Sequence, residues 1–189
     1  EVHSQIGGHG IVAIYNSGVP GKSILFRAEL DALPIQEINT FEHRSKYENA
    51  SHKCGHDGHL TILLGLVHQV ILHPPKMGKV IFMWQPAEEN GEGAKAMMAN
   101  SWFRTLNPDM VIALHNLPGY PMHQVVVRDQ AFTASVKSII IKLNGKTSHA
   151  AEPENGKNPA WPIWRILKAA DDMSNNDMQR KDFCVVTPV

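Results

Sequence analysis

The sequence lacks an excess of charge of one sign, a cysteine framework and a long apolar run. It carries 18 basic and 18 acidic residues, so its composition gives no electrostatic reason to expect binding to nucleic acid or to an anionic membrane. No apolar run approaches the roughly 20 residues that a membrane-spanning helix needs. Its 2 cysteines do not make a disulfide framework. We therefore expect a cytoplasmic protein with neither nucleic acid nor membrane as a partner.

What the sequence does contain is the composition of an ordinary globular protein, at 43% hydrophobic and 19% charged residues. Its 189 residues are enough to bury a core. Both ends look cut, because Glu1-Val2-His3 shows no helix-opening signal and Phe183 to Val186 is an apolar run without a polar tail. We expect the N-terminus to be truncated. The 11 histidines exceed what packing usually needs, so their neighbours are informative.

The first two thirds of the chain alternate between short apolar runs and segments with helical spacing, which predicts an α/β fold. A polar, irregular loop over residues 36–55 precedes the first helix and carries Cys54. Asp57 is placed to cap that helix, and His73-Pro74-Pro75 ends it. The expected strands are residues 11–15, 23–27, 79–84 and 110–114, and the expected helices are residues 58–72 and 91–99.

The sequence changes character after Arg128. Residues 136–143 approach the polar and apolar alternation of a half-exposed strand, unlike the apolar strands before them. A polar loop follows over residues 145–158, and Pro159 suits the first turn of a helix reaching Met173. We predict a catalytic domain over residues 1–130 and a second, partial domain over residues 131–189.

A cluster of metal-capable residues lies between His52 and His59. Cys54 and His56 are two positions apart, so in an extended loop their side chains point the same way. Gly55 between them lets the backbone bend close to an ion, and thiolate and imidazole are good zinc ligands. A buried free cysteine beside surface histidines is the alternative. The density of histidines here favours metal.

Glu88 and Glu89 follow the apolar strand over residues 79–84. On an extended segment two adjacent side chains face opposite sides, which suits them to different tasks. One carboxylate can bind metal while the other accepts a proton, the usual division in metal-assisted hydrolysis. A solvated acidic loop is the alternative.

Two further histidines stand at suitable places. His115 ends the strand over residues 110–114, and His149 lies among small residues in the later polar loop. Taken alone, His115 is better explained as a hydrogen-bonded core residue. His149 is equally well explained as an ordinary loop residue. Both gain weight only from the other segments.

Taken together, these segments resemble a known family. The motifs are D-A-L-P at 31–34, H-K-C-G-H-D-G-H at 52–59, Q-P-A-E-E at 85–89, L-H-N at 114–116 and S-H-A-A-E-P at 148–153. In order and spacing they are similar to those of the metal-dependent amidohydrolases, which include aminoacylases, hippurate hydrolases and plant auxin-conjugate hydrolases. The resemblance implies a zinc-exopeptidase-like catalytic domain with a central mixed sheet. It also implies an inserted α+β lid, which makes a homodimer and would begin near residue 131.

The resemblance also implies roles for individual residues. Glu88 would be the general base that takes a proton from the attacking water, and Asp31 would orient a ligand from behind it. Asp57 and His59 would support the site without binding metal. His149 would stabilise the developing oxyanion from the lid. The ligands of a two-metal centre would be Cys54, His56, Glu89 and His115.

The implied activity is hydrolysis of the amide bond in small N-acylated amino acids, with two divalent ions. Zn²⁺ or Mn²⁺ is expected, and Co²⁺ or Ni²⁺ is the alternative. A dipeptidase or exopeptidase using the same centre, and a non-catalytic metal-binding fragment, are the other candidate functions. Glu29 stands where many relatives have aspartate, a change we expect to be tolerated. Family members are longer and supply one more histidine ligand, so we expect this chain alone to bind metal weakly and turn over poorly.

Overall fold

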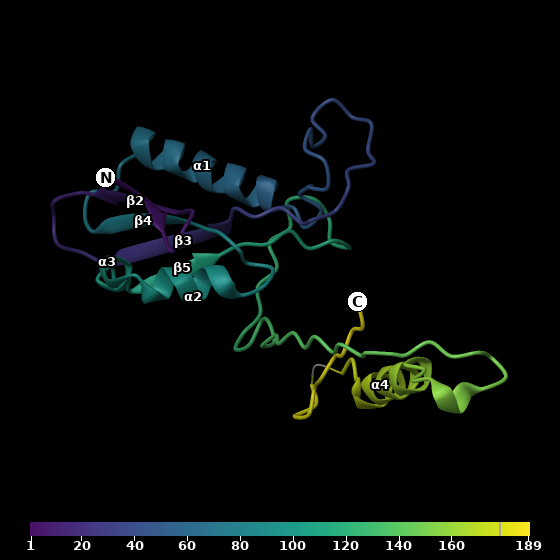
Figure 1. The fold of residues 1–189 in the computed structure, drawn as a ribbon. Coiled ribbons are helices and arrows are strands. Elements are labelled where there is room, and N and C mark those ends of the chain that lie inside the picture. The colour runs from purple at the N-terminus through teal and green to yellow at the C-terminus, as the bar shows by residue number, and fades with distance from the viewer. Residues whose placement is uncertain (178) are drawn as a thin grey trace. The chain divides into compact units, whose positions relative to one another are not determined.

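The computed structural model describes residues 1–177 and 179–189. The chain divides into two compact units, Glu1–Thr133 and Ala134–Val189 (Figure 1). All of the strands in the described residues belong to the first unit.

A five-stranded sheet in the order β1-β2-β4-β3-β5 forms the centre of the first unit. The β3 and β5 strands run parallel to their neighbours, whereas β1 and β2 pair antiparallel. Because β3, β4 and β5 are mutually parallel, their carboxyl ends lie at one edge of the sheet. The bounds of the strands are β1 Val2–Ile6, β2 Gly10–Asn16, β3 Ser23–Glu29, β4 Lys79–Gln85 and β5 Met110–Ala113.

Helix α1, His56–Leu72, covers one face of this sheet (Figure 1). Its apolar residues recur at helical spacing through Leu60, Leu63, Val67 and Val70, so one side of the helix can be buried. That side packs against the side chains that β3 and β4 present to this face, Ala28, Val80, Phe82 and Trp84.

The opposite face of the sheet is covered by α2, Glu92–Ala99, and the short α3, Ser101–Arg104 (Figure 1). Met97 of α2 is buried there against Val12, Leu25 and Ile81. Alternate residues of β4 thus serve opposite faces, with Ile81 on this face and its neighbours Val80 and Phe82 on the other. Apolar packing on both faces of the sheet therefore fixes the position of the edge at which β3, β4 and β5 end.

The model confirms the expected mixed α/β architecture, and the expected strands and helices of the first unit lie within a few residues of their predicted bounds. Strand β1 and helix α3 were not predicted. The polar sequence of β1, V-H-S-Q-I, gives little strand signal, and its pairing with β2 forms the strand. Asp57 was expected to cap α1, but Gly55 occupies the cap position and Asp57 lies in the first turn.

The second unit contains a single turn of 3₁₀-helix at Pro153–Asn155 and the helix α4, Ala160–Met173, close to the predicted helix. The predicted strand over residues 136–143 is wrong, because these residues pair with no other strand. A strand needs a neighbour to satisfy its backbone, and here Val136 and Ile140 stay 87% and 84% exposed. No helix in the described residues is long and apolar enough to cross a membrane.

The packing of α1 predicts a large difference between two adjacent leucines. Leu63 is 2% exposed and Leu64 is 52% exposed. Leu63→Ala should lower the free energy of unfolding by about 2–5 kcal/mol because it leaves a cavity against the sheet. The same substitution at Leu64 should change it by no more than about 0.5 kcal/mol. Urea denaturation followed by far-UV circular dichroism measures both, and equal losses would contradict this packing.

Candidate metal centre

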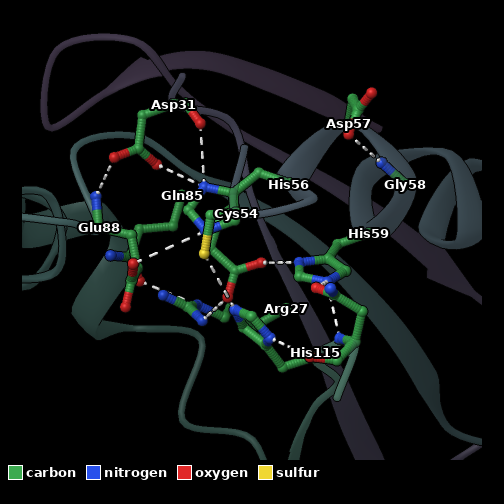
Figure 2. A network of polar contacts seen from close by, with 12 residues as sticks. Arg27, Asp31, Cys54, His56, Asp57, Gly58, His59, Gln85, Glu88 and His115 are labelled. Atoms are coloured by element: carbon green, nitrogen blue, oxygen red, sulfur yellow. Dashed lines mark hydrogen bonds and ion pairs between the residues drawn. The ribbon is translucent and has the colours of Figure 1, made fainter. Parts of the chain in front are cut away.

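The predicted site residues of the first unit come together at the carboxyl edge of the sheet (Figure 2). Asp31 follows β3, the Glu88–Glu89 pair follows β4, and His115 follows β5. Cys54 and His56 reach the same edge from the N-terminus of α1. Segments that are up to 84 residues apart, counted from 31 to 115, therefore meet because parallel strands end together.

Cys54 and His56 are separated by Gly55, which has a φ of 93° and precedes the first residue of α1. The backbone is therefore a left-handed turn and not the extended loop that was expected. The turn nevertheless brings the Cys54 Sγ and a ring nitrogen of His56 together with one of His115, all within 4.8 Å of one another. A side chain at position 55 would also press on Asn116, since an added Cβ would lie 2.7 Å from its Oδ1.

The His56 ring is completely buried, at 0% exposure, and its two nitrogens have different surroundings. Nδ1 donates to the backbone carbonyl of Asp31 at 2.9 Å. Nε2 is buried without a hydrogen-bond partner among the described residues. It faces Glu88 Oε2 and Glu89 Oε1, each 3.8 Å away, which is too far for a hydrogen bond.

Asp31 connects this histidine to the two glutamates. Its Oδ2 accepts from the backbone N–H of Glu88 at 2.7 Å and from that of Glu89 at 3.2 Å. Its Oδ1 lies 3.3 Å from His56 Nδ1. Asp31 therefore holds the ring of His56 through its backbone carbonyl and the loop opposite through its carboxylate (Figure 2).

The prediction that Glu88 and Glu89 face opposite sides of an extended segment is wrong. Strand β4 ends at Gln85, and Ala87 has a positive φ of 46°. Gly91 then donates to the Glu88 carbonyl at 2.9 Å, which closes a turn. Both carboxylates consequently come within 4.8 Å of the same His56 nitrogen.

His115 is oriented by its own backbone. Its Nδ1 donates to the carbonyl of Asn116 at 2.7 Å, which leaves Nε2 to face the Cys54 Sγ at 3.5 Å. As with His56, the ring nitrogen that faces the site is Nε2, and the other is occupied by a carbonyl. This arrangement is typical of metal-binding histidines.

The surroundings of Cys54 oppose ionisation of its thiol. Burial, then the nearby carboxylates Glu89 and Glu88, raise the pKa of Cys54 to about 11. The thiol is therefore protonated at neutral pH in the absence of a cation. A bound divalent cation would reverse this balance, since it neutralises the carboxylates and stabilises the thiolate.

The geometry fits a divalent metal ion. Zinc holds nitrogen and oxygen at about 2.0–2.2 Å and sulfur at about 2.3 Å, so two ligands of one ion lie about 3–4 Å apart. The separations of 3.5 Å between Cys54 and His115 and of 3.8 Å between His56 and each glutamate lie in that range. The unpartnered buried nitrogen of His56 is the strongest sign of an absent ligand.

Two residues lie behind the site: Glu29, for which no role was expected, and His59, for which only a supporting role was expected. Glu29 is 1% exposed and contacts His59, which is also 1% exposed. The sequence gives little signal for Glu29, because the predicted strand ends at residue 27 and β3 extends two residues further, to Glu29. Asp57, in contrast, is exposed and forms hydrogen bonds only within its own turn.

His149, the remaining predicted site residue, lies in the second unit and is exposed. Its Nδ1 accepts a hydrogen bond from the backbone N–H of Ala151 at 3.2 Å.

Comparisons with known proteins find relatives over nearly the whole chain. The hippurate hydrolase of Campylobacter jejuni is 34% identical over 187 residues, which cover 99% of this chain and 49% of that protein. An N-acetyldiaminopimelate deacetylase of Geobacillus thermodenitrificans is 38% identical over 178 residues, covering 94% of this chain and 47% of that protein. The chain thus spans about half the length of these curated relatives.

A solved structure is similar as well. It is a dinuclear metal-binding peptidase of the M20 family from Bacillus subtilis, with 32% identity and a TM-score of 0.58 over 64% of this chain and 34% of that one. The model of peptidase family M20/M25/M40 matches residues 25–181, which include every motif that carries the resemblance. This chain belongs to peptidase family M20/M25/M40.

Proposed function

We propose that this chain carries the metal centre of an amidohydrolase that cleaves the amide bond of small N-acylated amino acids. The observation that carries the proposal is the buried, unpartnered Nε2 of His56, which faces two carboxylates and lies beside a cysteine and a second histidine. A nitrogen buried in this way costs free energy unless a ligand satisfies it. Buried polar atoms usually have a hydrogen-bond partner, so an unpartnered nitrogen that faces two carboxylates supports a bound cation.

The proposed ligands of two divalent ions are Cys54, His56, Glu89 and His115. Their sulfur, nitrogen and oxygen donors suit Zn²⁺ or Mn²⁺, with Co²⁺ or Ni²⁺ as alternatives. When bound, the ions polarise the scissile carbonyl and lower the pKa of water towards neutrality. The dinuclear metal binding of the similar Bacillus subtilis protein supports the number of ions.

Glu88 is the proposed general base. Its carboxylate is about one-third exposed, at 35%, so it can reach both the site and a substrate. It takes a proton from the attacking water, which forms the new bond to the carbonyl carbon. The same proton then passes to the amide nitrogen as the carbon–nitrogen bond breaks, so that the leaving group departs as a neutral amine. Asp31 keeps Glu88 in place through the backbone hydrogen bond at 2.7 Å.

The names of the relatives support the substrate class, because a hippurate hydrolase and an N-acetyldiaminopimelate deacetylase both act on N-acylated amino acids. The peptidase designation of the similar solved structure favours a dipeptidase as the second candidate. Parallel assays of the full-length enzyme with hippurate and a simple dipeptide separate the two. The conclusion would change to a dipeptidase if only the dipeptide were cleaved.

The second unit, Ala134–Val189, is proposed as the start of a lid that also makes a homodimer. Exposed apolar side chains at Val136, Ile139 and Ile140 support an apolar partner surface on it. His149 is proposed to stabilise the oxyanion that forms on the substrate carbonyl. A cytoplasmic location completes the proposal.

The division of labour between the two glutamates is testable. Glu88→Gln should lower kcat for hippurate by about 10²–10⁴-fold, because the proton acceptor is lost, while metal content stays unchanged. Glu89→Gln should instead lose bound metal. Atomic emission spectrometry and a hydrolysis assay measure the two effects. Glu92→Gln, in the exposed first turn of α2, is the matched control and should alter neither. Loss of metal in Glu88→Gln, with metal retained in Glu89→Gln, would reverse the assignment.

The raised pKa of Cys54 gives a second test of the proposed centre. Without metal, the alkylation rate of Cys54 by iodoacetamide should rise roughly tenfold per pH unit from about pH 7 to about pH 10, since only the thiolate reacts and its pKa is about 11. Zn²⁺ should protect Cys54 but not the exposed Cys184. Peptide mass spectrometry follows both cysteines in one sample. Equal labelling of Cys54 with and without Zn²⁺ would exclude it as a ligand.

A further inference from the structure

A row of polar groups lies behind the proposed centre and connects the ends of β4, β3 and β5 (Figure 2). Its middle members, Glu29 and His59, are buried, whereas Asn116 at the β5 end is exposed. At one end, Arg27 Nε donates to Gln85 Oε1 at 3.0 Å. The Arg27 guanidinium also forms an ion pair with Glu29, whose carboxylate is almost completely buried. A buried carboxylate is stable only when it is paired in this way.

His59 on α1 continues the row from Glu29 towards β5. Its Nδ1 lies 2.9 Å from Glu29 Oε2, and because a carboxylate only accepts, this nitrogen carries the proton. On the other side of the ring, Nε2 contacts Asn116 twice. It accepts a hydrogen bond from the backbone N–H of Asn116 at 2.9 Å, and Asn116 Oδ1 lies 2.7 Å from it.

Asn116 contacts the proposed centre in two places, at His115 and at Gly55. Its carbonyl accepts from His115 Nδ1 at 2.7 Å, so its position determines which way the His115 ring points. Its side chain also packs against Gly55, the turn that separates Cys54 from His56. The distance between Cys54 Sγ and His115 Nε2 therefore depends on where Asn116 is held.

The same geometry argues against a separate metal site at Glu29, His56 and His59, although their potential ligand atoms lie within 4.8 Å of one another. The nitrogen of His59 that faces Glu29 is already hydrogen-bonded to it. His59 has Asn116 on its remaining nitrogen. Neither ring nitrogen of His59 is therefore available to bind an ion.

We propose that His59 is a positioning residue, which links Asn116 to the Arg27–Glu29 ion pair and thereby sets the orientation of the His115 ring. Its effect on metal binding rests on the function proposed above, whereas its effect on His115 does not. Residues that orient a ligand from behind typically change metal affinity about 10–100-fold.

Two substitutions of His59 each keep one of the two contacts that its ring makes. Asparagine places an amide near the position of Nδ1, so His59→Asn keeps a contact with Glu29 and loses Asn116. Glutamine reaches the position of Nε2, so His59→Gln keeps the contact with Asn116. His68→Asn, on the exposed side of the same helix, is the matched control for the asparagine substitution.

The first measurement needs no metal. Two-dimensional NMR of ¹⁵N-histidine-labelled, metal-free chain follows the ring nitrogens of His115. We expect His59→Asn to shift these signals, and His59→Gln and His68→Asn to leave them near their wild-type positions. Asn116→Ala keeps the backbone contact and loses the side-chain one, so it should give a smaller shift in the same direction. It also serves as the test if His59→Asn fails to fold by circular dichroism.

The second measurement is a titration with Co²⁺, followed by its visible absorption. His59→Asn should weaken Co²⁺ binding by about 10-fold or more, and His59→Gln should restore it to within about 3-fold of wild type. The inference is overturned if His115 signals and Co²⁺ binding are the same in all variants, or if the asparagine and glutamine variants are equally impaired. If wild type takes up no Co²⁺ but the His115 shift persists, the proposed function fails and the positioning role stands.

Discussion

The burial of the His56 ring is the constraint on which the rest of the site depends. A fully buried imidazole must have both nitrogens satisfied, or the fold loses stability. Asp31 occupies one of them through its carbonyl and uses its carboxylate to hold the backbone of Glu88 and Glu89. The other nitrogen is thereby directed at the two carboxylates and has no hydrogen-bond partner among the described residues. The same contacts that bury the ring thus leave one nitrogen available to the cation that we propose.

The sheet accommodates this polar site because apolar core residues and polar site residues occupy different parts of its strands. Val80, Phe82 and Trp84 fill the layer under α1, whereas the carboxylates and the histidine of the site follow β3, β4 and β5 by two to four residues. Arg27 and the buried Glu29 form an ion pair at the end of β3. The charges of this pair are compensated locally, so the polar edge can adjoin the apolar layer without an isolated buried charge.

Much of the fold and most of the site residues could be predicted from the sequence, since strand ends and ligand types are local signals. The motif around Cys54 and His56 gave the residues, but not the left-handed turn at Gly55 that brings them together. The turn at Ala87 reversed the expected directions of Glu88 and Glu89, and an alanine with positive φ leaves no mark in a sequence. Contacts such as Glu29 with His59, 30 positions apart, depend on tertiary packing. The strand expected over residues 136–143 failed because an alternating pattern does not supply the partner that a strand needs.

The position of β5 has a consequence for how the chain behaves in solution. Among the described residues this strand lies at the margin of the sheet, pairs with β3 alone, and exposes Met110, Val111 and Ile112. An apolar margin with unpaired backbone groups invites another polypeptide to add to it, and natural proteins blunt such margins with charges. Concentrated solutions of the chain will therefore tend towards self-association and precipitation through β5, and a lysine in place of Val111 would improve solubility.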